Sequence, residues 1–344
     1  ITNTQWSDQG SYTCRVGNAC GITTTRAAML SISSCPPTWA SMGDTGFGQR
    51  WVHAQAYSAV NAGTLVFGGR STSGNMLGDT WLKTNGLWRN VATTGPVARS
   101  DHALAELGNG HVLLFGGKAS AGASSALADT WEWNGNVWMK VSNSGPAARF
   151  GHVMALDSRR GRVVLFAGLD GTGVALGDTW EWTGSAWEQV ASMGPPVRFA
   201  HAMAFDPVSG ETMVIGGVNS VILNDTWAWS GSMWRQVATG GFTPRFYTAA
   251  AFDPQIGRVL LFGGSTASGA VGESYTWQGT SWTPVIFPTS PSARWTHAMS
   301  YDATSRSVVV SGGAGVGATR FSDSWEESGL PIVTSSPQDI VLVP

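Results

Sequence analysis

The amino-acid sequence predicts an all-β protein in which one unit of about fifty residues recurs six times. The phrase Asp-Thr-Trp, or a close variant, returns at intervals of 50, 49, 47, 48 and 50 residues. Each unit divides into short segments rich in Val, Leu, Phe and Trp that are bounded by turn residues, as β-strands are. No segment offers ten residues of helical periodicity. The six phrases begin at Asp79, Asp129, Asp178, Asp225, Glu273 and Asp323.

Each unit is predicted to form four strands in a fixed order. It opens with Arg-x-x-His or a variant, continues with an apolar run closed by small residues, and then reaches the acidic phrase. Between the first two strands, Asp157–Gly161 fits a tight hairpin, because Asp caps its own turn and Gly adopts positive φ. In the first five units a Trp stands nine residues after the acid. These tryptophans are Trp88, Trp138, Trp187, Trp234 and Trp282.

This pattern resembles the kelch repeat, which combines a double glycine, an acid before an aromatic residue and a later Trp at a period near fifty. The resemblance implies a six-bladed β-propeller with one four-stranded blade per repeat, similar in its repeat to the central domain of galactose oxidase. It assigns residues 36–330 to the propeller. It implies no single function, because propellers of this kind carry many unrelated activities.

The last unit lacks its outer strand, and the beginning of the chain supplies a matching piece. Trp39 lies eleven residues before Arg50, the same interval that separates Trp88 from Arg99. We therefore expect residues 38–43 to form the outer strand of the blade that contains Trp325. Such closure leaves no blade edge unpaired within the ring.

The flanking segments resemble a different kind of domain. Residues 8–14 resemble strand F of immunoglobulin-like domains, with a Tyr two residues before Cys14. Residues 1–35 are thus expected to be the end of such a domain, and residues 331–344 the start of another or a linker. We predict a Cys20–Cys35 disulfide, with a partner for Cys14 outside this segment. The alternative is three reduced thiols.

Composition excludes some partners. Charged residues make up 12% of the 344 residues, about half the usual share, and the formal net charge is −2. Without a basic stripe we expect no nucleic-acid partner, and no apolar stretch is long enough to span a membrane. The immunoglobulin-like flanks favour an extracellular or cell-surface location.

The sequence offers no convergent catalytic group, so we expect no enzymatic activity and no cofactor. The propeller contains no cysteine, which excludes the copper-radical chemistry of galactose oxidase. Five histidines share one repeat position, which predicts hydrogen-bonded structural residues spread around the ring rather than a metal site. They are His53, His102, His152, His201 and His297.

Two repeated sets remain as candidates for binding. Six arginines open the innermost strands, where they either line a channel rim and bind a polyanion or acidic sugar, or each bind a carboxylate or carbonyl of the blades. These are Arg50, Arg99, Arg149, Arg198, Arg245 and Arg294. The phrase tryptophans are expected to pack between blades, since each buries a large area. These are Trp81, Trp131, Trp180, Trp227 and Trp325.

The leading hypothesis is a non-enzymatic extracellular module for adhesion, binding or structural assembly within a multidomain surface protein. Its partner would be a protein or a glycan, and self-association into a larger assembly is possible in this hypothesis. Few lysines and many small polar residues favour extended protein contacts, because little side-chain entropy is lost. The alternative is a propeller that binds or modifies carbohydrate at the mouth of its axial channel.

Overall fold

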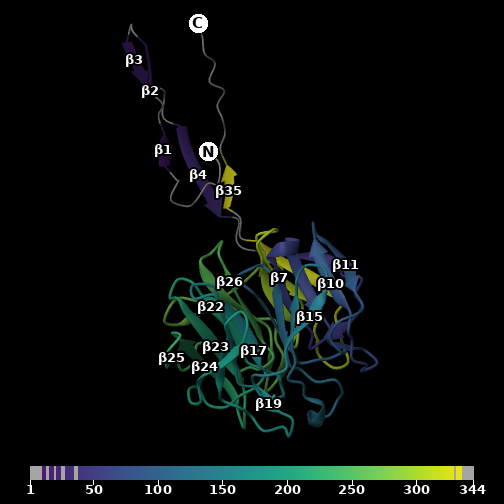
Figure 1. Ribbon diagram of the computed structural model, residues 1–344. Helices are drawn as coiled ribbons and strands as arrows, with labels where there is room; N and C mark the ends of the chain where they lie inside the picture. Colours follow the sequence, from purple (N-terminus) through teal and green to yellow (C-terminus); the bar gives the residue numbers. More distant parts are fainter. Residues whose placement is uncertain are drawn as a thin grey trace.

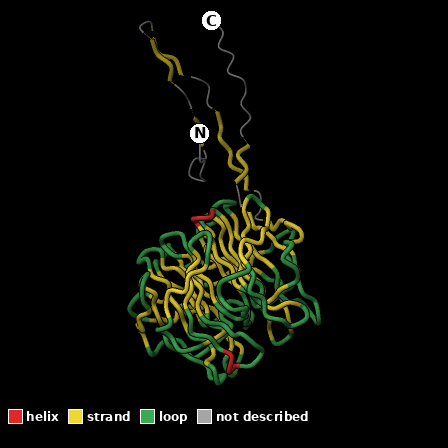
Figure 2. Tube along the Cα trace, turned by 45° about the vertical axis from the view of Figure 1, so that its right-hand side comes forward, coloured by secondary structure: helices red, strands yellow, loops and turns green. Residues whose placement is uncertain are grey.

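The computed structural model describes residues 10–12, 15–18, 21–24, 28–34, 38–328 and 331–334. Within them, six four-stranded antiparallel sheets form a ring, from which two thin segments project (Figures 1 and 2). The helical segments described are two 3-10 turns, η2 (Ala59–Asn61) and η3 (Ala123–Ser125). This confirms the predicted all-β fold with six blades.

In the first five blades the four strands follow one another in chain order. The blades consist of β7 (Ala54–Ser58), β8 (Gly63–Phe67), β10 (Thr80–Thr84) and β11 (Leu87–Ala92); β12 (Ala103–Glu106), β13 (Val112–Phe115), β14 (Thr130–Trp133) and β15 (Trp138–Ser142); β17 (Val153–Asp157), β18 (Arg162–Phe166), β20 (Thr179–Trp182) and β21 (Trp187–Ala191); β22 (Ala202–Asp206), β23 (Glu211–Val218), β24 (Ile222–Trp229) and β25 (Trp234–Ala238); and β26 (Ala249–Asp253), β27 (Arg258–Phe262), β30 (Ser274–Trp277) and β31 (Trp282–Val285).

The sixth blade combines both ends of the propeller. Its strands are β32 (Ala298–Asp302), β33 (Ser307–Ser311), β34 (Asp323–Ser328) and, on the outside, β5 (Thr38–Asp44). In the β34–β5 register Trp39 lies opposite Glu327 and Trp325 opposite Ser41. The Trp39 side chain is 1% exposed and its ring centre lies 5.5 Å from that of Phe262 in the fifth blade. The first described strand of the propeller is thereby tied to its last blade.

The innermost strands close the ring around the axis. Each of β7, β12, β17, β22, β26 and β32 contacts the innermost strand on both sides, and β32 contacts β7. Every described blade therefore has two neighbours, and both of its faces are covered.

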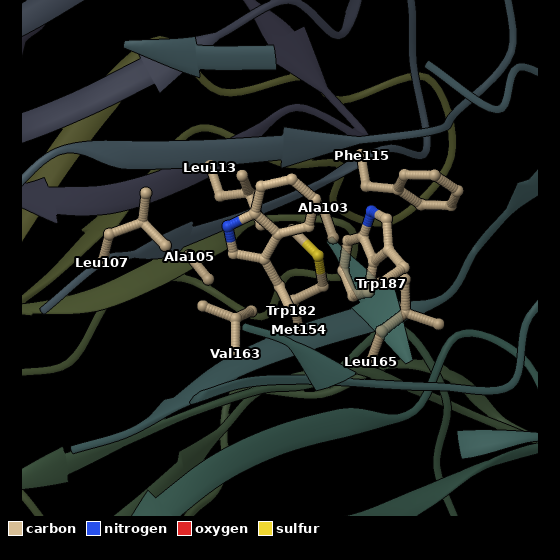
Figure 3. Close-up of a cluster of buried hydrophobic side chains, with 10 residues drawn as sticks. All are labelled: Ala103, Ala105, Leu107, Leu113, Phe115, Met154, Val163, Leu165, Trp182 and Trp187. Atoms are coloured by element: carbon tan, nitrogen blue, oxygen red, sulfur yellow. The ribbon is translucent and has the colours of Figure 1, made fainter. Parts of the chain in front are cut away.

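The interfaces between blades are apolar and centre on tryptophan. Between the second and third blades, Leu113 and Phe115 of β13 meet Leu165 of β18, with Trp182 and Trp187 filling the space (Figure 3). All five side chains are at most 8% exposed. Burying one Trp side chain contributes roughly 4–6 kcal/mol before the entropic cost. These contacts explain why the sequence repeats large aromatic residues.

The outer-strand tryptophan also forms a hydrogen bond to the preceding blade. Trp138 Nε1 donates to Thr80 Oγ1 at 2.9 Å, and both residues are buried. Four more pairs repeat this contact between successive blades, at 2.9–3.2 Å: Trp88–Ser324, Trp187–Thr130, Trp234–Thr179 and Trp282–Thr226. Trp39 is the exception, because its Nε1 has no hydrogen-bond partner among the described residues.

The double glycine at the end of the second strand permits close approach of two segments. In the first blade, Gly68 and Gly69 have φ of +64° and +96°. A Cβ atom on Gly68 would lie 2.7 Å from the carbonyl oxygen of Arg99 in the next blade, and one on Gly69 would lie 2.7 Å from Cβ of His53. Glycine is therefore required by both conformation and space.

The sixth blade carries a buried acid where most blades have tryptophan. At the position of Trp133, the first blade has Lys83 and the sixth has Glu327. Lys83 forms an ion pair with Glu326 across the interface between these blades. Glu327 instead faces Asp253 of the fifth blade, and the two side chains are 1% and 0% exposed. Burial and the nearby Asp253 charge raise the pKa of Glu327, and burial raises that of Asp253, so Glu327 favours its protonated form.

The described parts of the flanks form two small sheets. In one, β4 (Ala28–Ser34) lies between β1 (Gly10–Tyr12) and β35 (Pro331–Thr334), and in the other β2 (Arg15–Asn18) pairs with β3 (Gly21–Thr24). β4 and β35, one from each flank, thus lie in the same sheet. The predicted Cys20–Cys35 disulfide and the thiol of Cys14 lie outside the described residues. None of the described helices is long and apolar enough to cross a membrane.

Replacing Trp138 with Phe should lower the free energy of unfolding by about 1–3 kcal/mol, because Thr80 Oγ1 loses its donor in a buried site. Chemical denaturation of the wild type and the variant measures this difference. Trp39→Phe is the matched control, since it removes an indole that has no hydrogen-bond partner. An equal loss at both positions would show that indole volume, and not the hydrogen bond, sets the effect.

Glu327→Gln should remove an alkaline loss of stability. The raised pKa of Glu327, about 8, means that the folded state binds a proton that the unfolded state has released. Stability therefore falls by about 1.4 kcal/mol per pH unit as pH rises towards 8, and levels off above it. Thermal melts at pH 7 and pH 9 should differ more for the wild type than for Glu327→Gln. Exposed Glu188→Gln is the control, and a wild-type melting temperature that does not change over this range would contradict the raised pKa of Glu327.

Candidate functional site

The six repeat arginines lie inside the blades. Their side chains are 0–1% exposed. In five blades the guanidinium group donates from Nη1 and Nη2 to both oxygens of the phrase aspartate in the same blade, at 2.7–3.0 Å. In the fifth blade Arg245 Nη2 donates to Glu273 Oε2 at 2.5 Å. Each arginine is thus paired with an acid 27–30 residues later in the chain.

This placement corrects the channel-rim hypothesis for Arg50, Arg99, Arg149, Arg198, Arg245 and Arg294. None of the six is among the residues that line the central cavity. Each Nη1 also donates to a carbonyl oxygen at the end of the second strand, such as Gly216 O for Arg198 at 3.0 Å. The N–H groups of each guanidinium therefore donate to carboxylates and carbonyls of the blades, which is the second of the two roles that the sequence left open.

The repeated phrase completes this pairing with its tryptophan. Trp81 Nε1 donates to Asp79 Oδ2 at 2.6 Å, and the same contact recurs at 2.7–2.8 Å for Trp131, Trp180, Trp227 and Trp325. Burial opposes ionisation of Asp79, yet the hydrogen bonds and charge of Arg50 lower its pKa below the usual value. The phrase therefore forms an Arg–Asp–Trp cluster that serves the architecture.

The five repeat histidines are buried near the axis and do not form a metal site. Four of them pack edge-on against a Phe of the preceding blade, with ring centres 5.3–5.6 Å apart: His102, His152, His201 and His297. Their ring nitrogens have no hydrogen-bond partner among the described residues, so the expectation of hydrogen bonds holds only for His53, next to Ser311 Oγ at 3.1 Å. Burial and the adjacent arginine lower the pKa of His152 to about 3, which keeps it neutral. No group of three potential metal ligands occurs in the described chain.

A closed ring of main-chain hydrogen bonds surrounds the channel at the start of the innermost strands. Asp101 N donates to Val52 O at 3.0 Å, and each following blade repeats the contact at 2.7–3.1 Å until Val52 N donates to Thr296 O. Asp101 has φ of +57°, and the other five members also have positive φ. Below the ring lies a cavity of about 180 Å³, lined by all six innermost strands. The ring consists of Val52, Asp101, Gly151, Ala200, Tyr247 and Thr296.

Aromatic side chains surround this ring at one end of the channel, and we call this end the mouth. The residue after the repeat arginine is aromatic in five blades: Trp51, Phe150, Phe199, Phe246 and Trp295. Short ladders hold the backbone here, formed by β6 (Arg50–Trp51) with β9 (Arg70–Ser71), by β16 (Arg149–Phe150) with β19 (Leu169–Asp170), and by isolated bridges in other blades. The ladder of β28 (Ser265–Thr266) with β29 (Gly269–Ala270) lies in the neighbouring loop.

Cations stack on several of these rings. Lys118 Nζ lies 4.4 Å from the Phe150 ring centre and 3.5 Å from Asp101 Oδ2. Across the channel Tyr247 donates its hydroxyl to Asp101 Oδ1 at 3.5 Å, a long contact. Burial and the Asp101 charge raise the pKa of the Tyr247 hydroxyl. The mouth therefore joins aromatic faces, cations and one compensated carboxylate, a combination suited to binding.

A comparison with protein-family models matches residues 53–264 to the KLHDC2/KLHL20/DRC7 Kelch-repeats domain. This match covers more than half of the chain and agrees with the geometry of the six blades. The chain belongs to the kelch-repeat family. Kelch propellers generally mediate protein–protein interactions. No curated protein sequence matches the chain.

The kelch pattern also contained a signal for the mouth that the sequence analysis missed. The second position of Arg-x-x-His is aromatic in five of the six repeats. This recurrence could have marked the aromatic residue next to each repeat arginine as a candidate binding residue. Arg70 and Lys118 both follow a double glycine directly, but this position is uncharged in the other four repeats, and Arg320 lies in the loop before Asp323. Only the fold brings them to the same face.

Arg198→Gln should lower the free energy of unfolding by about 3–5 kcal/mol, because it leaves Asp225 charged and half-buried without its cation. Arg245→Gln is the matched variant in the next kelch repeat, and it should cost less because the Glu273 side chain is 50% exposed. Denaturant unfolding of both variants measures the difference. A stable Arg198→Gln variant that lost affinity for polyanions would restore the channel-rim hypothesis.

Proposed function

We propose that this kelch propeller is a non-enzymatic extracellular module for adhesion or structural assembly within a multidomain surface protein. In this proposal the mouth is the contact face, and the flanking strands carry the propeller as a stalk. Membership of the kelch family supports a protein partner. The resemblance of residues 8–14 to an immunoglobulin-like strand supports the extracellular setting.

The position of the stalk relative to the mouth carries this proposal. β5 begins at Thr38 and β34 ends at Ser328, and both ends lie where β33 starts, beside the turn between the first two strands of the blade. The mouth lies at the other end of the strands. In Figure 1, β4 and β35 project from one end of the propeller, and β19 marks the opposite end. The mouth therefore faces away from the stalk and is free to meet a partner.

The loops around the mouth have the composition of an interface. Val174, Val221 and Val316 lie in loops between second and third strands and are 60%, 60% and 73% exposed. Together with the central aromatic rings they form an apolar rim around an aromatic and cationic centre. Protein interfaces are enriched in aromatic residues and Arg and depleted in Lys, Glu and Asp. Binding energy in such interfaces is concentrated in a few central aromatic and arginine residues.

Titratable groups in the described kelch repeats support a non-enzymatic role. The phrase acids are paired with arginine and tryptophan, and the repeat histidines are neutral and packed between blades. Glu106, at the other end of the channel, has a pKa raised to about 7 by burial. No second acid or base accompanies it among the described residues that line its cavity. General acid–base chemistry needs such a partner within hydrogen-bonding reach of the substrate.

Light scattering of the full chain over a dilution series tests the assembly role. We expect species well above the 36.1 kDa monomer without any added ligand. Val221→Asp with Val316→Asp should return the protein to a monomer, because charges would be buried in the contact. Val208→Asp is the matched control, since Val208 is 74% exposed at the opposite end of the blades. A chain that stays monomeric at every concentration would contradict the assembly role.

A further inference from the structure

Two arginines at the mouth differ from the six repeat arginines. Arg70 of β9 and Arg320 of the loop before β34 place their guanidinium carbons 5.5 and 4.8 Å from the ring centre of Trp51. They come from the first and sixth blades and meet on the same indole. Neither forms an ion pair with a carboxylate in the part of the chain that the structure describes.

The hydrogen-bonding capacity of these two guanidinium groups is incompletely used. Nε of Arg70 is buried and has no partner among the described residues. Arg320 Nη1 donates to the main-chain oxygen of Thr319 at 2.7 Å, a neutral acceptor. A desolvated charged donor without an acceptor is costly. An oxyanion bound between the two groups would satisfy both their charge and their donors.

A cluster of four aromatic rings, tilted by 50–64° against one another, lies beside this pair of cations. The ring centre of Trp295 is 6.3 Å from Trp51, 5.5 Å from Tyr247 and 6.4 Å from Phe246. All four rings are partly exposed. They come from the first, sixth and fifth blades, and Tyr247 also lines the 180 Å³ cavity. A ligand with a ring-shaped apolar face next to its anionic group can stack on one of these rings beside the cations.

The main chain at the mouth is not available to an extended peptide. Arg70 pairs with Trp51, Ser265 with Phe246, and Ala314 with Trp295. The inner ring of hydrogen bonds uses the next residue of every blade. Strand addition needs unpaired N–H and C=O groups at an edge. The Tyr247 hydroxyl and the Asp101 carboxylate both line the cavity, and their mutual contact of 3.5 Å is long enough to be replaced by hydrogen bonds to ligand hydroxyls.

From these contacts we infer that Arg70, Arg320 and Trp51 form a binding site for a carboxylate-bearing sugar unit. The carboxylate lies between the two guanidinium groups, and the sugar ring stacks on one of the neighbouring aromatic rings. The hydroxyls of the sugar face Tyr247 and Asp101, whose charge is compensated by Lys118. This site goes beyond self-association, because it requires one copy of the chain only.

Calorimetric titration of the full chain with glucuronate tests the site. Glucose supplies the sugar ring without the charge, and acetate supplies the charge without the ring. We expect glucuronate to bind at least roughly tenfold more tightly than either, since both features contribute. Equal affinity for acetate and glucuronate, or no heat of binding with glucuronate, would overturn the inference.

Variants locate the binding on the structure. Arg70→Gln and Arg320→Gln should each weaken glucuronate binding roughly tenfold or more, because each removes a charge-assisted hydrogen bond. Neither variant breaks an ion pair of the described chain, so their melting temperatures should match the wild type. Arg306→Gln is the control, since Arg306 is exposed in the turn between β32 and β33, away from the mouth. Equal weakening by Arg306→Gln would place the binding elsewhere and overturn the site, whereas the mass of the unliganded chain decides the assembly role separately.

Discussion

The structure depends on one residue type that belongs to two blades at once, the arginine at the start of each repeat. Arg198 shows the arrangement: its main-chain N–H donates to Leu176 O at 3.3 Å, and its carbonyl oxygen accepts from Gly168 N at 3.0 Å, so its backbone is paired with the third blade. Its side chain is paired with Asp225 in the fourth. Removing the charge of the Arg198 side chain therefore affects the interface between the third and fourth blades as well as the fourth blade itself. Because a buried ion pair has a large desolvation cost, the dense set of hydrogen bonds around it is what makes it tolerable.

The same arginine position also determines the backbone conformation at the channel mouth. Two residues after each arginine, the chain adopts positive φ and enters the closed ring of main-chain hydrogen bonds. The intervening residue is directed to the mouth, and it is aromatic in five repeats. A left-handed conformation is unfavourable for non-glycine residues such as Tyr247 and Thr296, and it persists where the surroundings determine it strongly. Architecture and candidate binding surface are thus produced by adjacent residues of one motif, the first fully buried and the second, in four of the five aromatic cases, only partly buried.

Much of the fold could be predicted because repetition turns a weak local signal into a strong one. The turn at Asp157 forms as its residues indicate, with Oδ1 accepting from Arg159 N and Arg160 N, and Gly161 has φ of +67°. The direction of the arginine side chains could not be predicted. A strand pattern gives the face of a side chain only where the strand is regular, and the main chain of Arg50 lies in a two-residue ladder outside the four-stranded sheet. The raised pKa of Glu327 could not be predicted either, since the neighbouring Asp253 is 74 positions earlier in the printed sequence.

The sheet that joins the flanks has a consequence for how such a propeller combines with other domains. β4 and β35 are adjacent antiparallel strands, with Ser34 opposite Pro331, although almost three hundred residues separate them along the chain. β4 and β35 are therefore arranged like the two strands of a β-hairpin, and the whole propeller stands in place of the loop that would connect them. A loop whose two ends already lie side by side can be exchanged for a large folded insert with little loss of loop entropy. A propeller of this kind can therefore be inserted between two paired strands of a host domain without changing the register of those two strands.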